Sequence, residues 1–272
     1  SVPRGRIYDS EGRILVDNEP QNAITYTKLQ TTTQEEMLKI ADMLASIIEK
    51  KLDDVTLRDK QDYWIMLHRD KAYERVTKKE EAKMLSDETL TTTDMQKQID
   101  KLVRDRITEE DLASLSNEEL EVLAIYREMS SGYALSPQII KSDDVTPEEF
   151  ARVSERLTEM KGVNTTTDWV RLPMSSLAIL GRTTSPKEGI PKSKLEYFLA
   201  RDYTRNDRVG RSYIEQEYEE ILQGQKSVVK NITDGKGTVT ETQTVFEGQP
   251  GKDLVLTIDS EINSKVESLV EA

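Results

Sequence analysis

The sequence predicts an α+β protein, with an elongated strand-rich framework that carries an inserted helical subdomain. Two sequence patterns support this prediction. Short segments with β-branched alternation lie towards both ends of the chain, and the long region between them repeats helix-capping motifs. Hydrophobic residues make up 36% and charged residues 33% of the 272 residues, so the surface is large relative to the core. We therefore expect a multi-lobed molecule.

Residues 1–30 have the pattern of strands. Ile24 and Tyr26 alternate with polar neighbours, which is typical of a half-buried strand. Between two such stretches, the sequence DSEG ends at Gly12, and glycine accepts the positive φ of a tight turn. We predict a hairpin turn here.

Residues 31–162 are predicted to be helical because a capping box recurs. In this motif a hydroxyl accepts a hydrogen bond from an exposed backbone N–H, and an acid three residues later reaches back. The pairs are Thr33 with Glu36, Thr108 with Asp111, Ser116 with Glu119, and Thr146 with Glu149. Pro147 adds a start signal and Gly162 a stop signal.

Apolar spacing supports the same assignment. Two stripes have helical periodicity: Met37, Ile40, Ala41, Leu44, Ile47 and Ile48 form the first, and Phe150, Val153, Leu157 and Met160 form the second. We interpret these stripes as the core of a helical subdomain. A groove that binds a partner is the alternative.

From residue 163 onward, the sequence again predicts both strands and helices. An extended segment leads to short helices after Pro191 and before Gly224. Residues 227–246 show β-branched alternation around Asp234-Gly235, which predicts a hairpin. The stretch LVLTID predicts a further strand, and a helix is expected to begin near Ser260.

Composition excludes several classes of function. The net charge of −13 argues against nucleic acid and anionic membrane surfaces as partners. No apolar run approaches the ~18 residues that span a bilayer, and no signal peptide is visible. Cysteine is absent, which excludes disulfides, thiolate chemistry and cysteine-ligated metals. The single histidine, His68, cannot build a histidine-rich metal site, so we predict no metal and no cofactor.

One tetrad has the form of a catalytic pair. Ser227 and Lys230 match Ser-x-x-Lys, in which a lysine on the same helical face takes the proton of the serine. Here the tetrad is β-branched and leads into the predicted hairpin, where residues three apart point to opposite faces. The companion motifs Ser-x-Asn and Lys-Thr-Gly do not occur in the chain. We interpret the tetrad as structural, and a stand-alone serine acyl transferase is the alternative.

Four stretches resemble the signatures of class B penicillin-binding proteins. RGRIYDSEG matches Arg-Gly-x-Ile-x-Asp-x-x-Gly, RNDRVGRSYIEQEYEEILQG is similar to a later signature, and LTID resembles the strand that opens the transpeptidase domain. RLPMSSLAILGRT is a looser match, because Leu172-Pro173 replaces the usual Tyr-Pro. The signature residues that carry the resemblance are Arg4, Gly5, Asp9, Gly12, Arg171, Gly181, Arg208, Gly210, Glu215, Gly224 and Asp259.

The resemblance implies a non-catalytic N-terminal region, of Gram-positive type, from a peptidoglycan D,D-transpeptidase. Residues 1–30 and 163–253 would form a pedestal, residues 31–162 a helical head, and residues 254–272 the start of the transpeptidase domain. The family's catalytic Ser-x-x-Lys follows the LTID strand, so no catalytic residue is expected in this chain. Within the pedestal, we expect Arg4, Asp9, Arg208 and Glu215 to form buried ion pairs; surface placement is the alternative.

The resemblance also implies a location and partners. The family places a transmembrane helix before the first signature, so we expect an anchor that this chain lacks and a position on the extracytoplasmic face of the cell membrane. Expected partners are the protein's own transpeptidase domain, membrane proteins of the cell division or elongation machinery, and a second copy in a homodimer. An unrelated extracellular adaptor is the remaining alternative. The sequence does not distinguish septal from lateral wall synthesis.

Overall fold

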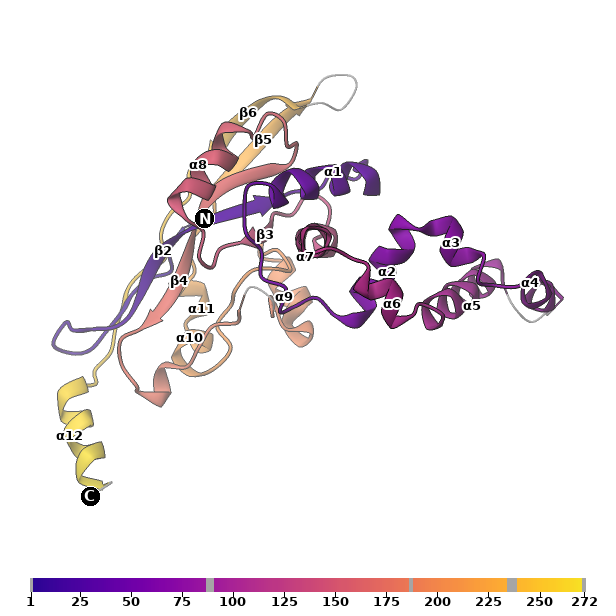
Figure 1. The fold of residues 1–272 in the computed structure, drawn as a ribbon. Coiled ribbons are helices and arrows are strands. Elements are labelled where there is room, and N and C mark those ends of the chain that lie inside the picture. The colour runs from indigo at the N-terminus through magenta and orange to yellow at the C-terminus, as the bar shows by residue number, and fades with distance from the viewer. Residues whose placement is uncertain (1, 87–90, 186–187, 234–238, 271–272) are drawn as a thin grey trace. The chain divides into compact units, whose positions relative to one another are not determined.

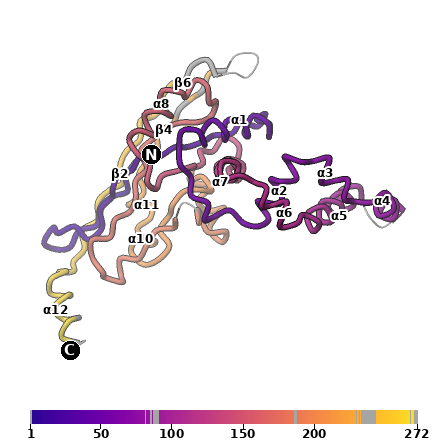
Figure 2. Tube along the Cα trace, viewed as in Figure 1, coloured from indigo at the N-terminus to yellow at the C-terminus, as the bar shows by residue number. Residues whose placement is uncertain are grey.

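The computed structural model describes residues 2–86, 91–185, 188–233 and 239–270 (Figure 1). The chain divides into two compact units. Unit 1 comprises Ser1–Thr27, Ser136–Leu157 and Val163–Ala272, and unit 2 comprises Lys28–Leu135 and Thr158–Gly162. The Cα trace shows the chain leaving unit 1 after its first strands and returning to it after the helices of unit 2 (Figure 2).

Unit 1 is built on a five-stranded sheet with the order β3-β2-β1-β7, in which β4 also pairs with β2. Its strands are β1 (Ile7–Tyr8), β2 (Ile14–Tyr26), β3 (Gln138–Lys141), β4 (Val163–Pro173) and β7 (Leu254–Val255). The antiparallel β2–β4 ladder runs from Val16 opposite Pro173 to Tyr26 opposite Val163. By contrast, β1 and β7 are parallel, with Ile7 opposite Leu254. The first and last strands of this sheet are therefore neighbours.

A second, two-stranded sheet pairs β5 (Val228–Thr233) with β6 (Val239–Phe246) in antiparallel fashion. It occupies the segment for which the sequence predicts a hairpin. The turn predicted at Asp234-Gly235 lies outside the described residues.

Short helices complete unit 1. They are α8 (Pro147–Glu155), η1 (Ala178–Leu180), η2 (Lys192–Lys194), α9 (Leu195–Leu199), α10 (Tyr213–Glu217), α11 (Glu219–Leu222) and α12 (Ser260–Val270). One apolar cluster joins the sheet to these helices and contains Ile7, Leu15, Val16, Leu180 and Leu222. A smaller cluster contains Ile190, Phe198 and Val209. The first cluster places α10 and α11 next to the start of β2, where the signature residues meet.

Unit 2 is helical. Its helices are α1 (Gln34–Ala45), α2 (Leu57–Leu67), α3 (Arg69–Tyr73), α4 (Lys78–Leu85), α5 (Thr92–Asp105), α6 (Glu109–Ala113) and α7 (Asn117–Ser131). Helix α1 packs against α7, and the predicted stripe of α1 buries Met37, Ile40, Ala41 and Leu44. None of the described helices is long and apolar enough to cross a membrane.

The capping predictions are confirmed. Thr33, Thr108, Ser116 and Thr146 each cap a helix and form the full reciprocal box with the acid three residues on. Thr56 with Asp59 and Thr77 with Glu80 form two further boxes that the sequence analysis did not single out. These boxes depend only on neighbours in the sequence, which is why sequence reasoning finds them.

Two details of the helical prediction are wrong. Strand β3 interrupts the range 31–162, because the short apolar stretch around Ile139 and Ile140 pairs with β2. Helix α8 also ends at Glu155 rather than at Gly162, so the second predicted stripe is helical only in its first half. Residues 156–162 form turns that lead into β4, and Gly162 adopts a φ of 87° there.

Candidate functional site

Four signature-region side chains form a buried ion cluster in unit 1. The ion cluster consists of Arg4, which precedes β1, Arg171 on β4, Glu215 on α10 and Glu219 on α11. Arg4 Nη2 lies 2.9 Å from both Glu215 Oε2 and Glu219 Oε2, and Arg171 Nε lies 2.6 Å from Glu215 Oε1. The side chains of both arginines are 10% exposed, and those of the glutamates 2% and 6%. Two cations thus meet two anions away from water.

Neutral groups satisfy much of the remaining hydrogen-bonding capacity of the ion cluster. Arg4 Nη1 donates to Gln223 Oε1 at 2.8 Å, and the backbone N–H of Gly210 donates to Glu219 Oε2 at 2.6 Å. Asn18 accepts from Arg171 Nη1 at 3.0 Å and donates to the carbonyl of Arg4 at 2.8 Å. Buried charges need such partners, because their desolvation otherwise outweighs their mutual attraction. The ion cluster therefore requires the whole surrounding geometry to be correct.

The local electrostatics differ between the two arginines. Burial alone would lower the pKa of Arg4, but the charges and hydrogen bonds of Glu219 and Glu215 outweigh it and raise that pKa. Burial lowers the pKa of Arg171, and the nearby charge of Arg4 adds to this effect against the opposing effect of Glu215. Glu215 contributes to the pKa of both arginines because it is the one member of the ion cluster that pairs with both cations.

A second polar centre joins the first signature to the third. The Asp9 side chain is fully buried, and its Oδ2 accepts from Arg13 Nε at 2.7 Å and from Ser260 Oγ at 2.7 Å. Asp9 Oδ1 accepts from the backbone N–H groups of Glu11 and Arg13. Arg13 Nη2 reaches Asp259 Oδ1 at 2.5 Å, and Asp259 accepts from backbone N–H groups in the first turn of α12. Burial would raise the Asp9 pKa, but the hydrogen bonds from Ser260 and Arg13 hold it well below its usual range.

Four of the five signature glycines lie where backbone segments approach each other closely. A Cβ on Gly5 would lie 1.8 Å from the Lys252 carbonyl oxygen, and one on Gly210 would lie 1.8 Å from the Glu215 carbonyl oxygen. Gly181 and Gly224 likewise lie against the backbone of Ser212 and Gln249, whereas Gly12 has a φ of 79° and open space around it. Gly210 thus lets the chain approach the helix that carries Glu215.

Arg4, Asp9, Arg208 and Glu215 are the signature residues expected to form buried ion pairs. The structure brings only Arg4 and Glu215 together. Asp9 pairs with Arg13, and Arg208 pairs with the buried Asp168 on β4. Glu219 was not among the expected residues, although its spacing of four from Glu215 is the spacing that places two side chains on one face of a helix.

The Ser227 and Lys230 pair lies apart from this site. Lys230 lies within β5, as predicted, whereas Ser227 lies one residue before that strand, and both residues are exposed. Neither residue is in a helix, where a lysine three residues after a serine lies on the same face. This arrangement does not direct Lys230 towards the Ser227 hydroxyl.

The charges of the site are used in pairing with one another, so its chemistry is that of a structural joint rather than of a reaction centre. It connects the first residues of unit 1 to helices α10 and α11 and to the start of α12. The fold and the site thus define a structural support module whose polar core joins distant parts of the chain.

Comparison with known proteins identifies the family. The family model described as "Penicillin-binding Protein dimerisation domain" matches residues 1–256, so the chain belongs to this family. It is 47% identical to penicillin-binding protein 2A of Bacillus subtilis (strain 168) over 274 residues, which cover 100% of this chain and 38% of that protein. Identity to penicillin-binding protein 2B of Streptococcus pneumoniae (strain D39 / NCTC 7466) is 28%, covering 100% of this chain and 40% of that protein.

A solved structure agrees with the fold. Penicillin-binding protein 2B from Streptococcus pneumoniae (strain 5204) superposes with a TM-score of 0.72 at 26% identity, covering 100% of this chain and 42% of that chain. These relatives are class B penicillin-binding proteins, and the chain spans about two fifths of their length. The resemblance and the α+β class predicted from the sequence are confirmed. Within the family, the chain is the non-catalytic dimerisation or pedestal region.

Proposed function

We propose that this chain is the extracytoplasmic pedestal of a membrane-anchored, serine-type D,D-transpeptidase that crosslinks peptidoglycan. In this proposal, unit 1 supports the catalytic domain and the helices of unit 2 contact other membrane proteins of cell-wall synthesis. Membership of the penicillin-binding protein family supports the enzyme class, since the relatives are named for penicillin binding. The support role rests on one structural observation, the β1–β7 seam.

The β1–β7 seam is the row of contacts between residues 6–13 and residues 253–260. Its strand part consists of backbone hydrogen bonds from Leu254 to Arg6 at 2.8 Å and from Leu256 to Tyr8 at 2.8 Å. Beyond the strands, the N–H of Ser10 donates to the carbonyl of Ile258 at 2.9 Å. Asp9 and Arg13 then hold the first turn of α12.

Each hydrogen bond of this kind contributes about 1 kcal/mol net, and several in series resist separation together. A segment that enters unit 1 at Arg4 is thereby fixed to the helix that starts at Ser260. That is the arrangement a pedestal needs if it is to transmit the position of a membrane anchor to a catalytic domain.

Labelling with a fluorescent penicillin tests the enzyme class. We expect the full-length protein to be labelled covalently and this chain to remain unlabelled, because Ser227 and Lys230 lie at the start of β5 and not on the helix that a Ser-x-x-Lys pair requires. Labelling of this chain that disappears in Ser227→Ala would instead support a stand-alone acyl transferase. An unlabelled full-length protein, folded as judged by circular dichroism, would overturn the proposal.

Membrane fractionation and sedimentation test the remaining parts of the proposal. The full-length protein should sediment with membranes and be digested by protease added outside protoplasts. A homodimer of this chain would appear as a concentration-dependent increase in sedimentation coefficient. Recovery of the full-length protein in the soluble cytoplasmic fraction would contradict the location.

A further inference from the structure

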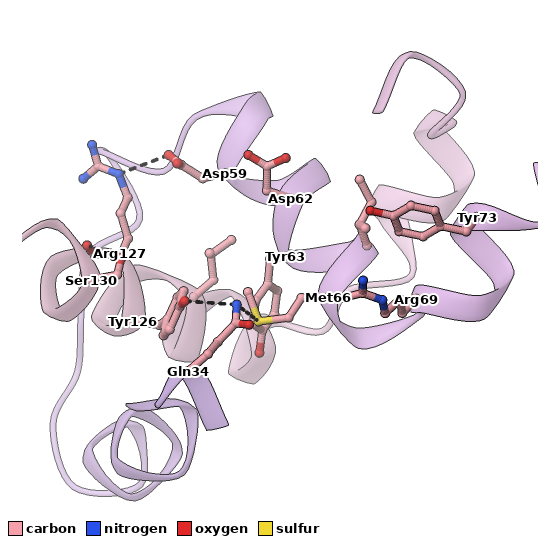
Figure 3. A pocket seen from close by; sticks show the side chains of 12 residues that line it. Gln34, Asp59, Asp62, Tyr63, Met66, Arg69, Tyr73, Tyr126, Arg127 and Ser130 are labelled. Atoms are coloured by element: carbon pink, nitrogen blue, oxygen red, sulfur yellow. Dashed lines mark hydrogen bonds and ion pairs between the residues drawn. The ribbon is translucent and has the colours of Figure 1, made fainter. Parts of the chain in front are cut away.

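Unit 2 contains an open groove of about 470 Å³ between helices α1, α2, α3 and α7 (Figure 3). Its volume is within the range of about 300–1,000 Å³ that is usual for small-molecule sites. Figure 3 shows Tyr126, Gln34 and Met66 together in one part of the lining and Arg69 beside Tyr73 in another. None of these residues takes part in the ion cluster or in the β1–β7 seam.

The carboxylates of the groove are already neutralised. Asp59 Oδ2 lies 3.1 Å from Arg127 Nε, and Asp62 Oδ1 lies 2.7 Å from Arg104 Nε. A strongly basic peptide would therefore meet no unpaired acid there. A purely apolar helix would also fit poorly, because polar side chains interrupt the aromatic surface.

The groove keeps hydrogen-bonding groups available. The Tyr126 hydroxyl accepts from Gln34 Nε2 at 3.2 Å and, among the described residues, donates its own proton to none. The Arg69 guanidinium lies 5.3 Å from the centre of the Tyr73 ring, and no carboxylate in the described part of the chain is within ion-pair distance of it. Gln34 retains its side-chain oxygen as an acceptor.

We infer that this groove binds a saccharide. A sugar ring offers weakly positive C–H groups on its faces and hydroxyls at its edge. The hydroxyls suit the donors and acceptors of Tyr126, Gln34 and Arg69, and the C–H faces suit the aromatic lining, of which Tyr126 is half-buried. The open side of the groove suits a chain whose ends continue into solvent.

The saccharide that we assign is the N-acetylated glycan strand of the cell wall. Arg69 suits the lactyl carboxylate that N-acetylmuramic acid carries, since this cation has no anionic partner of its own. This last assignment rests on the proposed function, whereas the saccharide chemistry rests on the groove. Such a site would hold unit 2 on the polymer that the parent enzyme crosslinks.

Titration followed by NMR tests the inference, with this chain and a peptide-free tetrasaccharide of alternating N-acetylglucosamine and N-acetylmuramic acid as the probe. We expect saturable shifts for amides around the groove. Arg69→Gln should weaken binding about 10-fold and Tyr126→Phe about 5-fold, from the usual contributions of charged and neutral hydrogen bonds. Lys97→Gln, which makes the same charge change at an exposed position on α5, should leave affinity unchanged.

Several results would overturn the inference. One is the absence of binding, and another is equal binding by the three variants. A third is a stem peptide without sugar that shifts the groove amides when the glycan does not. Binding of chitotetraose without binding of the wall fragment would overturn the cell-wall assignment. Because penicillin labelling of the full-length protein is a separate measurement, failure of the groove inference is distinguishable from failure of the proposed function.

Discussion

Arg4 and Glu215 lie 211 positions apart in the sequence, and their side chains form an ion pair of 2.9 Å in the interior of unit 1. Glu215 also accepts from Arg171 on β4 at 2.6 Å. One carboxylate thus connects the segment before β1, the long strand β4 and helix α10. The stability of unit 1 should therefore depend on this carboxylate more than on any exposed acid.

Glu215→Gln removes the negative charge but keeps the size of the side chain. It leaves Arg4 paired with Glu219 and removes the buried carboxylate that pairs with Arg171, and breaking such a network costs about 3–5 kcal/mol. The free energy of unfolding by urea can be followed through Trp169 on β4 in a Trp64→Phe background, since the chain has two tryptophans. Glu220→Gln, at a side chain that is 65% exposed, should cost less than about 0.5 kcal/mol. Equal effects of the two substitutions would contradict the role of the ion cluster.

Gly210 and Gly12 should respond differently to alanine. At Gly210 the new methyl group would overlap the Glu215 carbonyl oxygen at 1.8 Å, so we expect Gly210→Ala to prevent accumulation of soluble, folded chain. At Gly12 there is space for a methyl group, and the cost is only that of a φ of 79°, about 1–2 kcal/mol. Soluble yield and melting temperature measure both effects. A Gly210→Ala chain that melts within a few degrees of the parent would contradict the close approach.

Acid should destabilise unit 2 through Glu80. Hydrogen bonds from Arg106 and then from Thr77 lower the pKa of Glu80 to about 2 from 4.5. Because the folded pKa is depressed, the contribution to stability is complete above pH 4.5 and is lost as the pH falls towards 2. The melting temperature reported by Trp64 should fall across this range, and Glu80→Gln should flatten the profile. Glu74→Gln, at an exposed position, is the matched control and should keep the profile of the parent.

Sequence reasoning predicted the local features of this fold well. The four capping boxes and the turn at Gly12 depend on residues within four positions of one another, and each is present in the structure. The end of α8 was predicted wrongly because residues 156–162 form turns that lead into β4, and the partner of β4, strand β2, is more than a hundred residues away. The local spacing of apolar residues does not indicate which distant segment a strand will pair with.

The contacts within the ion cluster could not be predicted from the sequence either. The resemblance located Arg4, Arg171, Arg208 and Glu215, but a signature does not state which cation faces which anion. The pairing depends on the β2–β4 ladder and on the close approach at Gly210. Arg208 accordingly pairs with Asp168 rather than with Glu215. The parallel pairing of β1 with β7 was also unpredictable, because each strand has only two residues and a pattern that short does not identify a partner.

Asp9→Asn should loosen the start of α12 without unfolding unit 1. Asp9 Oδ2 accepts from both the hydroxyl and the backbone N–H of Ser260, and its Oδ1 holds the turn that ends at Arg13. An amide at this position presents one acceptor oxygen in place of two and repels the Arg13 and Ser260 donors with its NH₂ group. The first turn of α12 should then open more often, while the β2–β4 ladder keeps its pairing. The rate of hydrogen exchange at the amides of residues 260–262 should rise about 10-fold, and the rate in the β2–β4 ladder should stay the same.

Glu11→Gln is the matched control in the same turn, because the Glu11 side chain is exposed, and it should leave both regions unchanged. Unchanged exchange at residues 260–262 in Asp9→Asn would show that the strand hydrogen bonds of the β1–β7 seam hold α12 by themselves.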